Sequence, residues 1–149
     1  MRARDLAEPF PTVTADTPAV EAARLLAGQN LPGLIVVDGR GRPVTILPGT
    51  QVLRMAVPRY CQDDPTLARV IDEAAADLFL RELGERTVAD TLPKERRELP
   101  VVDPDATVLE IAAVMARMRS PLVAVVEGRD APMLGAVTLD ALLDRMLAA

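Results

Sequence analysis

The feature of this sequence that most constrains its fold is an internal repeat. When the chain is shifted by 89 positions, residues 11–43 align with residues 100–132 without a gap. Twelve of the 33 aligned positions are identical, whereas two unrelated stretches of average composition share about two or three. The chain is therefore expected to contain two copies of one supersecondary unit.

Each copy begins its first helix with a recognisable start signal. In copy one, Thr17 is a capping residue and Pro18 occupies the first helical position. In copy two, Thr107 and Glu110 have the spacing of a capping box, in which each side chain accepts a hydrogen bond from the other residue's amide. Apolar residues then recur at helical spacing. They are Val20, Ala23 and Ala27 in copy one, and Val108, Ile111, Ala112 and Met115 in copy two.

Both copies continue with two strands and a second helix. The apolar runs at 34–37 and 122–126 do not alternate with polar residues, which is typical of strands buried on both faces. The sequence DGRGRP at 38–43 is a turn signal that predicts a hairpin. The closing helices are predicted over 52–57 and 139–148.

These elements define the expected fold and its domains. With the short extended pieces at 11–13 and 100–102, each copy reads strand–helix–strand–strand–helix. The fold class is α/β (α+β), with small mixed sheets flanked by helices. One copy of about 55 residues is too small to bury its helix faces alone, so the whole chain is expected to form a single module. We divide it into repeat one (1–57), a linker (58–85) and repeat two (86–149).

The linker contains a predicted amphipathic helix. Asp64 caps its start, Pro65 takes the first position and Gly84 ends it. Its apolar stripe is formed by Leu67, Val70, Ile71, Ala74 and Leu78. Two readings of this helix remain open. It packs on its own module, or it docks a second copy or a partner, because Phe79 and Leu80 extend the apolar surface beyond one stripe.

The composition excludes several classes of function. The net charge of −5 and the aromatic content of 2% argue against nucleic-acid binding. The chain has no His and a single Cys, Cys61, which rules out a His-based metal site, a Ser-His-Asp triad and an internal disulfide. No general base, nucleophile or metal set suggests an enzyme. No apolar run reaches the ~20 residues that span a bilayer, and no secretory signal is visible, so a cytoplasmic location is expected.

The repeats resemble the cystathionine-β-synthase (CBS) domain, and the chain looks like a stand-alone tandem CBS pair. The resemblance is carried by VVDGRGRPV and AVVEGRDAPMLGAVTLDALL, each preceded by a helix like TPAVEAARLL or ATVLEIAAVM, and extends over about 105 residues. Residues 87–100 and 2–11 are similar to the short lead-in before such repeats. The resemblance implies two repeats packed around a pseudo-twofold axis, with clefts that bind adenine nucleotides. It also implies that the protein forms homodimers and regulates a partner without catalysing a reaction itself.

The family's ligand signature is a Thr or Ser at the end of the hairpin's second strand, with an Asp three residues later. The two residues lie at a helix N-terminus, where amides and the helix dipole favour an anion. Copy one has Pro48 and Gln51 at these positions. Copy two keeps Thr138 but places Asp140 one residue early, and one residue rotates a helical side chain by ~100°.

The resemblance also implies that each cleft combines the start of one repeat with the end of the other. The candidate ligand-binding residues of the better-preserved cleft are Pro11, Leu31, Pro32, Thr138 and Asp140. The other cleft combines Pro100, Ser120 and Pro121 with Pro48 and Gln51. A purely structural reading stands beside this one, because Thr and Asp are also ordinary residues at the start of a helix.

Two functions follow from these observations. The first is a non-enzymatic regulatory module that requires no cofactor. It senses an adenine-nucleotide-like ligand, such as AMP, ADP, ATP or S-adenosylmethionine, and signals to a partner. The second is a ligand-free dimeric adaptor for a separately encoded transporter or enzyme, with degenerate clefts. Thr138 favours the first, and the displaced Asp favours the second. Either function predicts a homodimer without nucleic-acid binding or membrane insertion.

Overall fold

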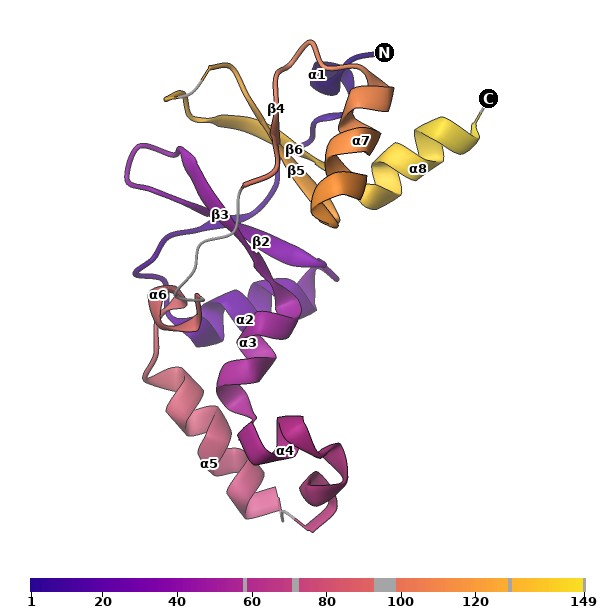
Figure 1. Ribbon diagram of the computed structural model, residues 1–149. Helices are drawn as coiled ribbons and strands as arrows, with labels where there is room; N and C mark the ends of the chain where they lie inside the picture. Colours follow the sequence, from indigo (N-terminus) through magenta and orange to yellow (C-terminus); the bar gives the residue numbers. More distant parts are fainter. Residues whose placement is uncertain (58, 71–72, 93–98, 129, 149) are drawn as a thin grey trace. The chain divides into compact units, whose positions relative to one another are not determined.

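The computed structural model describes residues 1–57, 59–70, 73–92, 99–128 and 130–148. Its strands form two three-stranded sheets, ordered β1-β2-β3 and β4-β5-β6, each drawn from one repeat (Figure 1). The strands are β1 Thr12–Val13, β2 Gly33–Val37, β3 Pro43–Pro48, β4 Val101–Val102, β5 Leu122–Val126 and β6 Met133–Thr138. The helices are α1 Ala3–Leu6, α2 Ala19–Gly28, α3 Gly49–Ala56, α4 Arg59–Asp63, η1 Pro65–Val70, α5 Glu73–Gly84, α6 Val88–Thr91, α7 Val108–Met118 and α8 Leu139–Leu147.

The second sheet shows why the fold is mixed α/β. Strand β4 pairs with β5 in parallel, and β5 pairs with β6 in an antiparallel hairpin. Every residue of β2 and of β5 is buried, which confirms the interpretation of the two unbroken apolar runs. Helices α7 and α8 lie side by side next to this sheet (Figure 1). The predicted fold class, two small mixed sheets flanked by helices, is confirmed.

The first helices of the two repeats begin at equivalent residues and are followed by equivalent backbone turns. Pro18 is the N-cap of α2 and Thr107 is the N-cap of α7. The Thr107 hydroxyl accepts a hydrogen bond from the Glu110 amide at 3.1 Å, which is one half of the predicted capping box. After the helices, Asn30 and Arg119 both adopt left-handed backbone conformations, with φ of 52° and 50°. The duplication therefore preserves backbone geometry even where the side chain changes.

The predicted start and inner face of α2 are wrong. The Thr17 hydroxyl accepts from the Thr14 amide at 3.0 Å and caps no helix, and Pro18 is the N-cap. The buried residues of α2 are Ala19 and Ala22, not the Val20 stripe. The cause is long-range, because the Ala19 amide donates to the Arg86 carbonyl at 2.9 Å and the segment before α6 covers this face. In copy two, Ile111 and Met115 are buried as predicted.

The segment between the repeats differs from the single helix that the sequence predicts. It contains the 3₁₀-helix η1 and then α5, which ends at Gly84 as predicted. The Asp64 carboxylate accepts from the Thr66 amide and hydroxyl, which favours the tight first turn of η1. Leu67 and Val70 are 41% and 83% exposed, so they do not form a buried stripe. Ile71 lies outside the described residues.

Two compact units divide the chain across the repeats. Unit 1 comprises Met1–Thr12, Ile35–Ile46 and Arg97–Ala149, and unit 2 comprises Val13–Leu34 and Leu47–Arg96. Each unit is therefore assembled from segments of both repeats.

The short lead-in helices account for much of this exchange. In unit 1, α1 of repeat one packs on repeat two, and the Ala3 amide donates to the Ala106 carbonyl at 2.8 Å. In unit 2, α6 packs on repeat one, and the Val88 amide donates to the Thr17 carbonyl at 2.8 Å. Each repeat therefore receives the lead-in helix that precedes the other.

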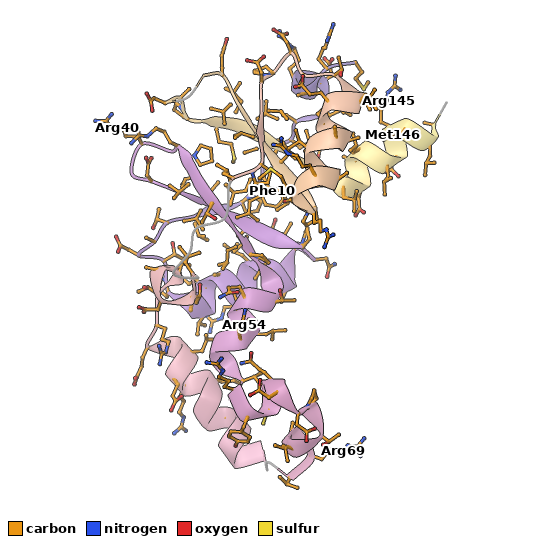
Figure 2. The ribbon with its side chains drawn as sticks, in the orientation of Figure 1. Phe10, Arg40, Arg54, Arg69, Arg145 and Met146 are labelled. Carbon is orange, nitrogen blue, oxygen red and sulfur yellow. The ribbon has the colours of Figure 1, made fainter. Side chains whose placement is uncertain are left out.

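Within unit 1, the hairpin tip of repeat one contacts that of repeat two. The Met133 amide donates to the Gly41 carbonyl at 3.0 Å, and Gly41 can supply this turn because its φ is +78°. Partial desolvation raises the pKa of Asp38. Hydrogen bonds from the Arg42 and Arg40 amides and from the Arg42 guanidinium lower it by more, so its pKa lies below the ordinary value. Arg40 itself points away from the hairpin (Figure 2).

Candidate functional site at the start of helix α8

Thr138 joins the last strand of unit 1 to its last helix. It pairs with Leu122 in the sheet and is the N-cap of α8. Its hydroxyl oxygen accepts from the Ala141 amide at 3.1 Å. The next amide, that of Leu139, donates to the Pro121 carbonyl at 2.9 Å. The Thr138 side chain is half-buried. Its position is fixed by the pairing with Leu122, by the bond from the Ala141 amide, and by the bond of the next amide to the Pro121 carbonyl.

The Thr138 hydroxyl and the start of α8 can still interact with a ligand. A hydroxyl that accepts one hydrogen bond still has its own hydrogen to donate. The nine-residue helix α8 places the positive end of its dipole at the same point, where an anionic group such as a phosphate is favoured. Asp140 is exposed in the first turn of α8, a position at which a carboxylate stabilises the helix itself.

At the equivalent position in copy one, the residues make contacts within the protein. Pro48 is the N-cap of α3 and makes no side-chain cap bond. The Gly49 amide donates to the Pro32 carbonyl at 3.2 Å, as Leu139 does to Pro121. The Gln51 side-chain amide donates to the Thr91 carbonyl at 2.8 Å and ties α3 to α6. An ionised Asp at position 51 has no hydrogen to donate to that carbonyl, so Gln51 performs a task that the family's carboxylate cannot.

The five predicted site residues are distributed over both units. Thr138 and Asp140 adjoin one another in unit 1, which also contains the half-buried Pro11. Leu31 and Pro32 belong to unit 2, where Pro32 contacts the start of α3 through the bond to Gly49.

Pro121, which the sequence prediction placed in the other cleft, also contacts the start of α8. Its carbonyl holds the first amide of α8 within unit 1. The signal was present in the sequence, because Pro32 and Pro121 are identical positions of the repeat and each precedes a buried strand.

An apolar groove runs between α7 and α8 beside this site. Its volume is about 470 Å³. The lining residues are Ala112, Met115, Ala116, Arg119, Ser120, Pro121, Leu139, Leu142, Leu143 and Met146. On α8, Leu143 and Met146 remain 42% and 45% exposed, and Figure 2 labels Met146 on that helix. Arg119 is the single charged residue among those that line the groove.

Among the residues that the structure describes, no three His, Cys, Asp or Glu side chains gather into a group that could hold a metal ion. In the same residues, no helix combines the length and the apolar character needed to cross a membrane.

Two strand–helix–strand–strand–helix repeats, each with a lead-in helix, define a class of paired small α/β domains. The CBS domain profile matches residues 3–54 and 91–148, which is more than half of the chain. The chain therefore belongs to the CBS domain family and contains a tandem pair. Pairs of this kind are generally regulatory and non-catalytic.

Solved structures agree with this assignment. A CBS domain-containing protein of unknown function from Kribbella flavida is 52% identical, with 99% of each chain covered and a TM-score of 0.85. The CBS-pair protein CBSX2 from Arabidopsis thaliana is 16% identical, with 99% of this chain and 94% of that chain covered and a TM-score of 0.75. CBSX2 has also been solved in complex with AMP (16% identity, 99% and 96% covered, TM-score 0.69). Comparison with curated proteins gives no significant match.

Proposed function

We propose that this chain is a non-enzymatic regulatory module that binds one adenine nucleotide through the start of α8 and signals to a partner protein. The observation that carries the proposal is the Thr138 cap, a hydroxyl at a helix N-terminus in the position of the family's signature residue. The complex of CBSX2 with AMP supports the choice of ligand class. The ligand site includes Thr138 and Asp140, with Pro11, Leu31 and Pro32 as its further proposed residues.

Titration calorimetry with AMP tests this proposal, with an expected stoichiometry near one per chain. Copy one lacks the hydroxyl, since Pro48 replaces it, and its Gln51 is bonded to Thr91. Thr138→Val removes a donor to a charged group, which is worth about 1.5–3 kcal/mol, so AMP affinity should fall at least about tenfold. Thr138→Ser keeps the hydroxyl and should retain binding, and Thr50→Val should change little, because Thr50 is exposed on α3.

The outcomes of this titration separate the two candidate functions. Loss of binding in Thr50→Val but not in Thr138→Val would place the ligand at copy one and contradict the assignment. Absence of binding by AMP, ADP, ATP and S-adenosylmethionine would favour the ligand-free adaptor. That second function has a specific observation behind it, since the Thr138 oxygen and the Gln51 amide each already bond within the chain.

The second part of the proposal is a homodimer that uses the α7–α8 groove. Resemblance to the family implies dimers, and the groove offers an apolar surface with Arg119 as its one charged lining residue. An apolar surface of this kind suits a second copy of itself, because a twofold interface places the same patch on both chains.

Light scattering at micromolar concentrations should therefore give twice the chain mass of 16.0 kDa. Leu143→Glu places a charge in the groove and should shift the equilibrium to monomer. Leu109→Glu is the matched control, because Leu109 is exposed on α7 but does not line the groove. A monomer mass for the unmodified chain, or equal effects of both variants, would count against this interface.

A further inference from the structure

Residues 1–8, which we call the strap, are seated on repeat two within unit 1. Ala3 is fully buried in the same core cluster as Val102 and Ala106. The Ala3 amide donates to the Ala106 carbonyl at 2.8 Å, and the Arg4 amide donates to the Pro104 carbonyl at 3.0 Å. The turn before α7 thus offers two carbonyls and a small pocket that an alanine side chain fills.

The other end of the strap adds to the sheet. Strand β6 lies at the edge of the β4-β5-β6 order. The Glu8 amide donates to the Ala136 carbonyl and the Ala136 amide donates to the Glu8 carbonyl, each at 3.0 Å. This reciprocal pair is an antiparallel bridge, so the strap covers part of an edge that would otherwise offer unpaired backbone groups.

Gly135 makes this approach sterically feasible. A Cβ at position 135 would lie 2.9 Å from the Glu8 carbonyl oxygen and 3.2 Å from the Ala7 Cβ. The first distance is shorter than van der Waals contact permits, and the obstacle is backbone. A glycine on an edge strand marks a close approach of another backbone, and here that backbone is the strap.

The strap ends at a proline-rich joint. Pro9 and Pro11 flank Phe10 and restrict the backbone there, and among the described residues the bridge at Glu8 is the last backbone pairing of this segment with β6. The outer contacts of the strap are exposed charges, including the Arg4–Asp105 ion pair and an Arg2 guanidinium bond to the Asp105 carbonyl. Exposed pairs of this kind contribute little to affinity, so the strap is held by Ala3, by the partly buried Leu6 and Ala7 that pack on the same core cluster, and by its backbone hydrogen bonds to repeat two.

We propose that the strap is a detachable element, and that its seat is a peptide-binding site whose occupant is residues 1–8 of this chain. Recognition combines strand addition at the β6 edge with a buried alanine anchor at the turn before α7. The seat is distinct from the nucleotide site, and the proposal holds whether or not a nucleotide binds. Opening the strap frees the Ala136 N–H and C=O, on the strand that continues to Thr138.

A peptide-binding experiment on full-length protein tests this proposal. Ala3→Arg should undock the strap and leave the seat intact, so a labelled peptide of residues 1–9 should bind it saturably in fluorescence anisotropy. The unmodified chain should bind the peptide at least about tenfold more weakly, because its own strap occupies the seat. Adding Gly135→Val to Ala3→Arg should remove peptide binding. A folded Ala3→Arg protein that does not bind the peptide would overturn the proposal.

Native-state hydrogen exchange provides a second test that does not depend on the variants. A detachable strap should let the Ala3, Glu8 and Ala136 amides exchange through a local opening, at a lower free energy than the Val123 and Val125 amides of β5. Equal protection of both groups would show that the strap leaves only when the whole chain unfolds. That result would overturn the proposal even if Ala3→Arg failed to fold.

Discussion

A fragment of residues 1–57 is expected to be unfolded in water, although it contains the whole of repeat one. The fragment lacks α6, so the carbonyls of Thr17 and Ala15 lose the Val88 and Ala89 amides that they bond at 2.8 and 3.0 Å. It also lacks the entire seat of α1, which includes the Ala106 carbonyl. A segment of this size has little core of its own, so the whole folding free energy should be lost.

Circular dichroism and amide chemical-shift dispersion will measure the structure of this fragment. The full chain is the control, and it should unfold in a single transition when followed by circular dichroism and by calorimetry. The exchanged lead-in helices are the reason, because each unit contains segments of both repeats. A stably folded 1–57 fragment, or two separate transitions in the full chain, would contradict this prediction.

Ile111→Ala should destabilise the chain by about 2–5 kcal/mol, the range found for large-to-alanine changes in cores. Ile111 is 0% exposed and lies in the core cluster with Val123, Val125 and Leu142. Removing its side chain leaves a cavity where α7 packs on the second sheet, and close-packed neighbours refill such a cavity only in part. The midpoint of urea unfolding will report the loss.

Leu109→Ala is the matched control for this change. Leu109 lies on the same helix, two residues earlier, and is 75% exposed. Its truncation should alter the free energy of unfolding by less than about 0.5 kcal/mol. Similar losses for both variants would mean that α7 does not bury the face described here.

The strength of the apolar pattern explains why the buried face could be predicted from the sequence for α7 but not for α2. In α7, Ile111 and Met115 are large apolar residues four positions apart, and both are buried as predicted. In α2, alanines lie on several sides of the helix, and Ala19 and Ala22 look no different from Ala23 in sequence. A small side chain carries little hydrophobic signal, so long-range contacts decided the face.

The candidate site shows the same limit. The cap at Thr138 follows from residue type and position, and the structure contains it. The use of Gln51 does not follow from local sequence, because its partner carbonyl, Thr91, is 40 positions away. The exchange of lead-in helices was equally hidden, since the aligned repeat begins at residue 11 and α1 and α6 lie outside it. Alignment of the copies identifies equivalent elements but not which copy each element packs against.

The exchange of α1 and α6 also sets an order of assembly on the ribosome. All residues of unit 2 have been synthesised once Arg96 is added, so its internal contacts can begin to form while repeat two is still being made. Unit 1 has to wait, because residues 1–12 find their partners in residues 97–149. During this interval the segment around Ala3 has no seat, and a chaperone or a neighbouring nascent chain can reach it. The earliest-made part of this module is thus among the last to be placed.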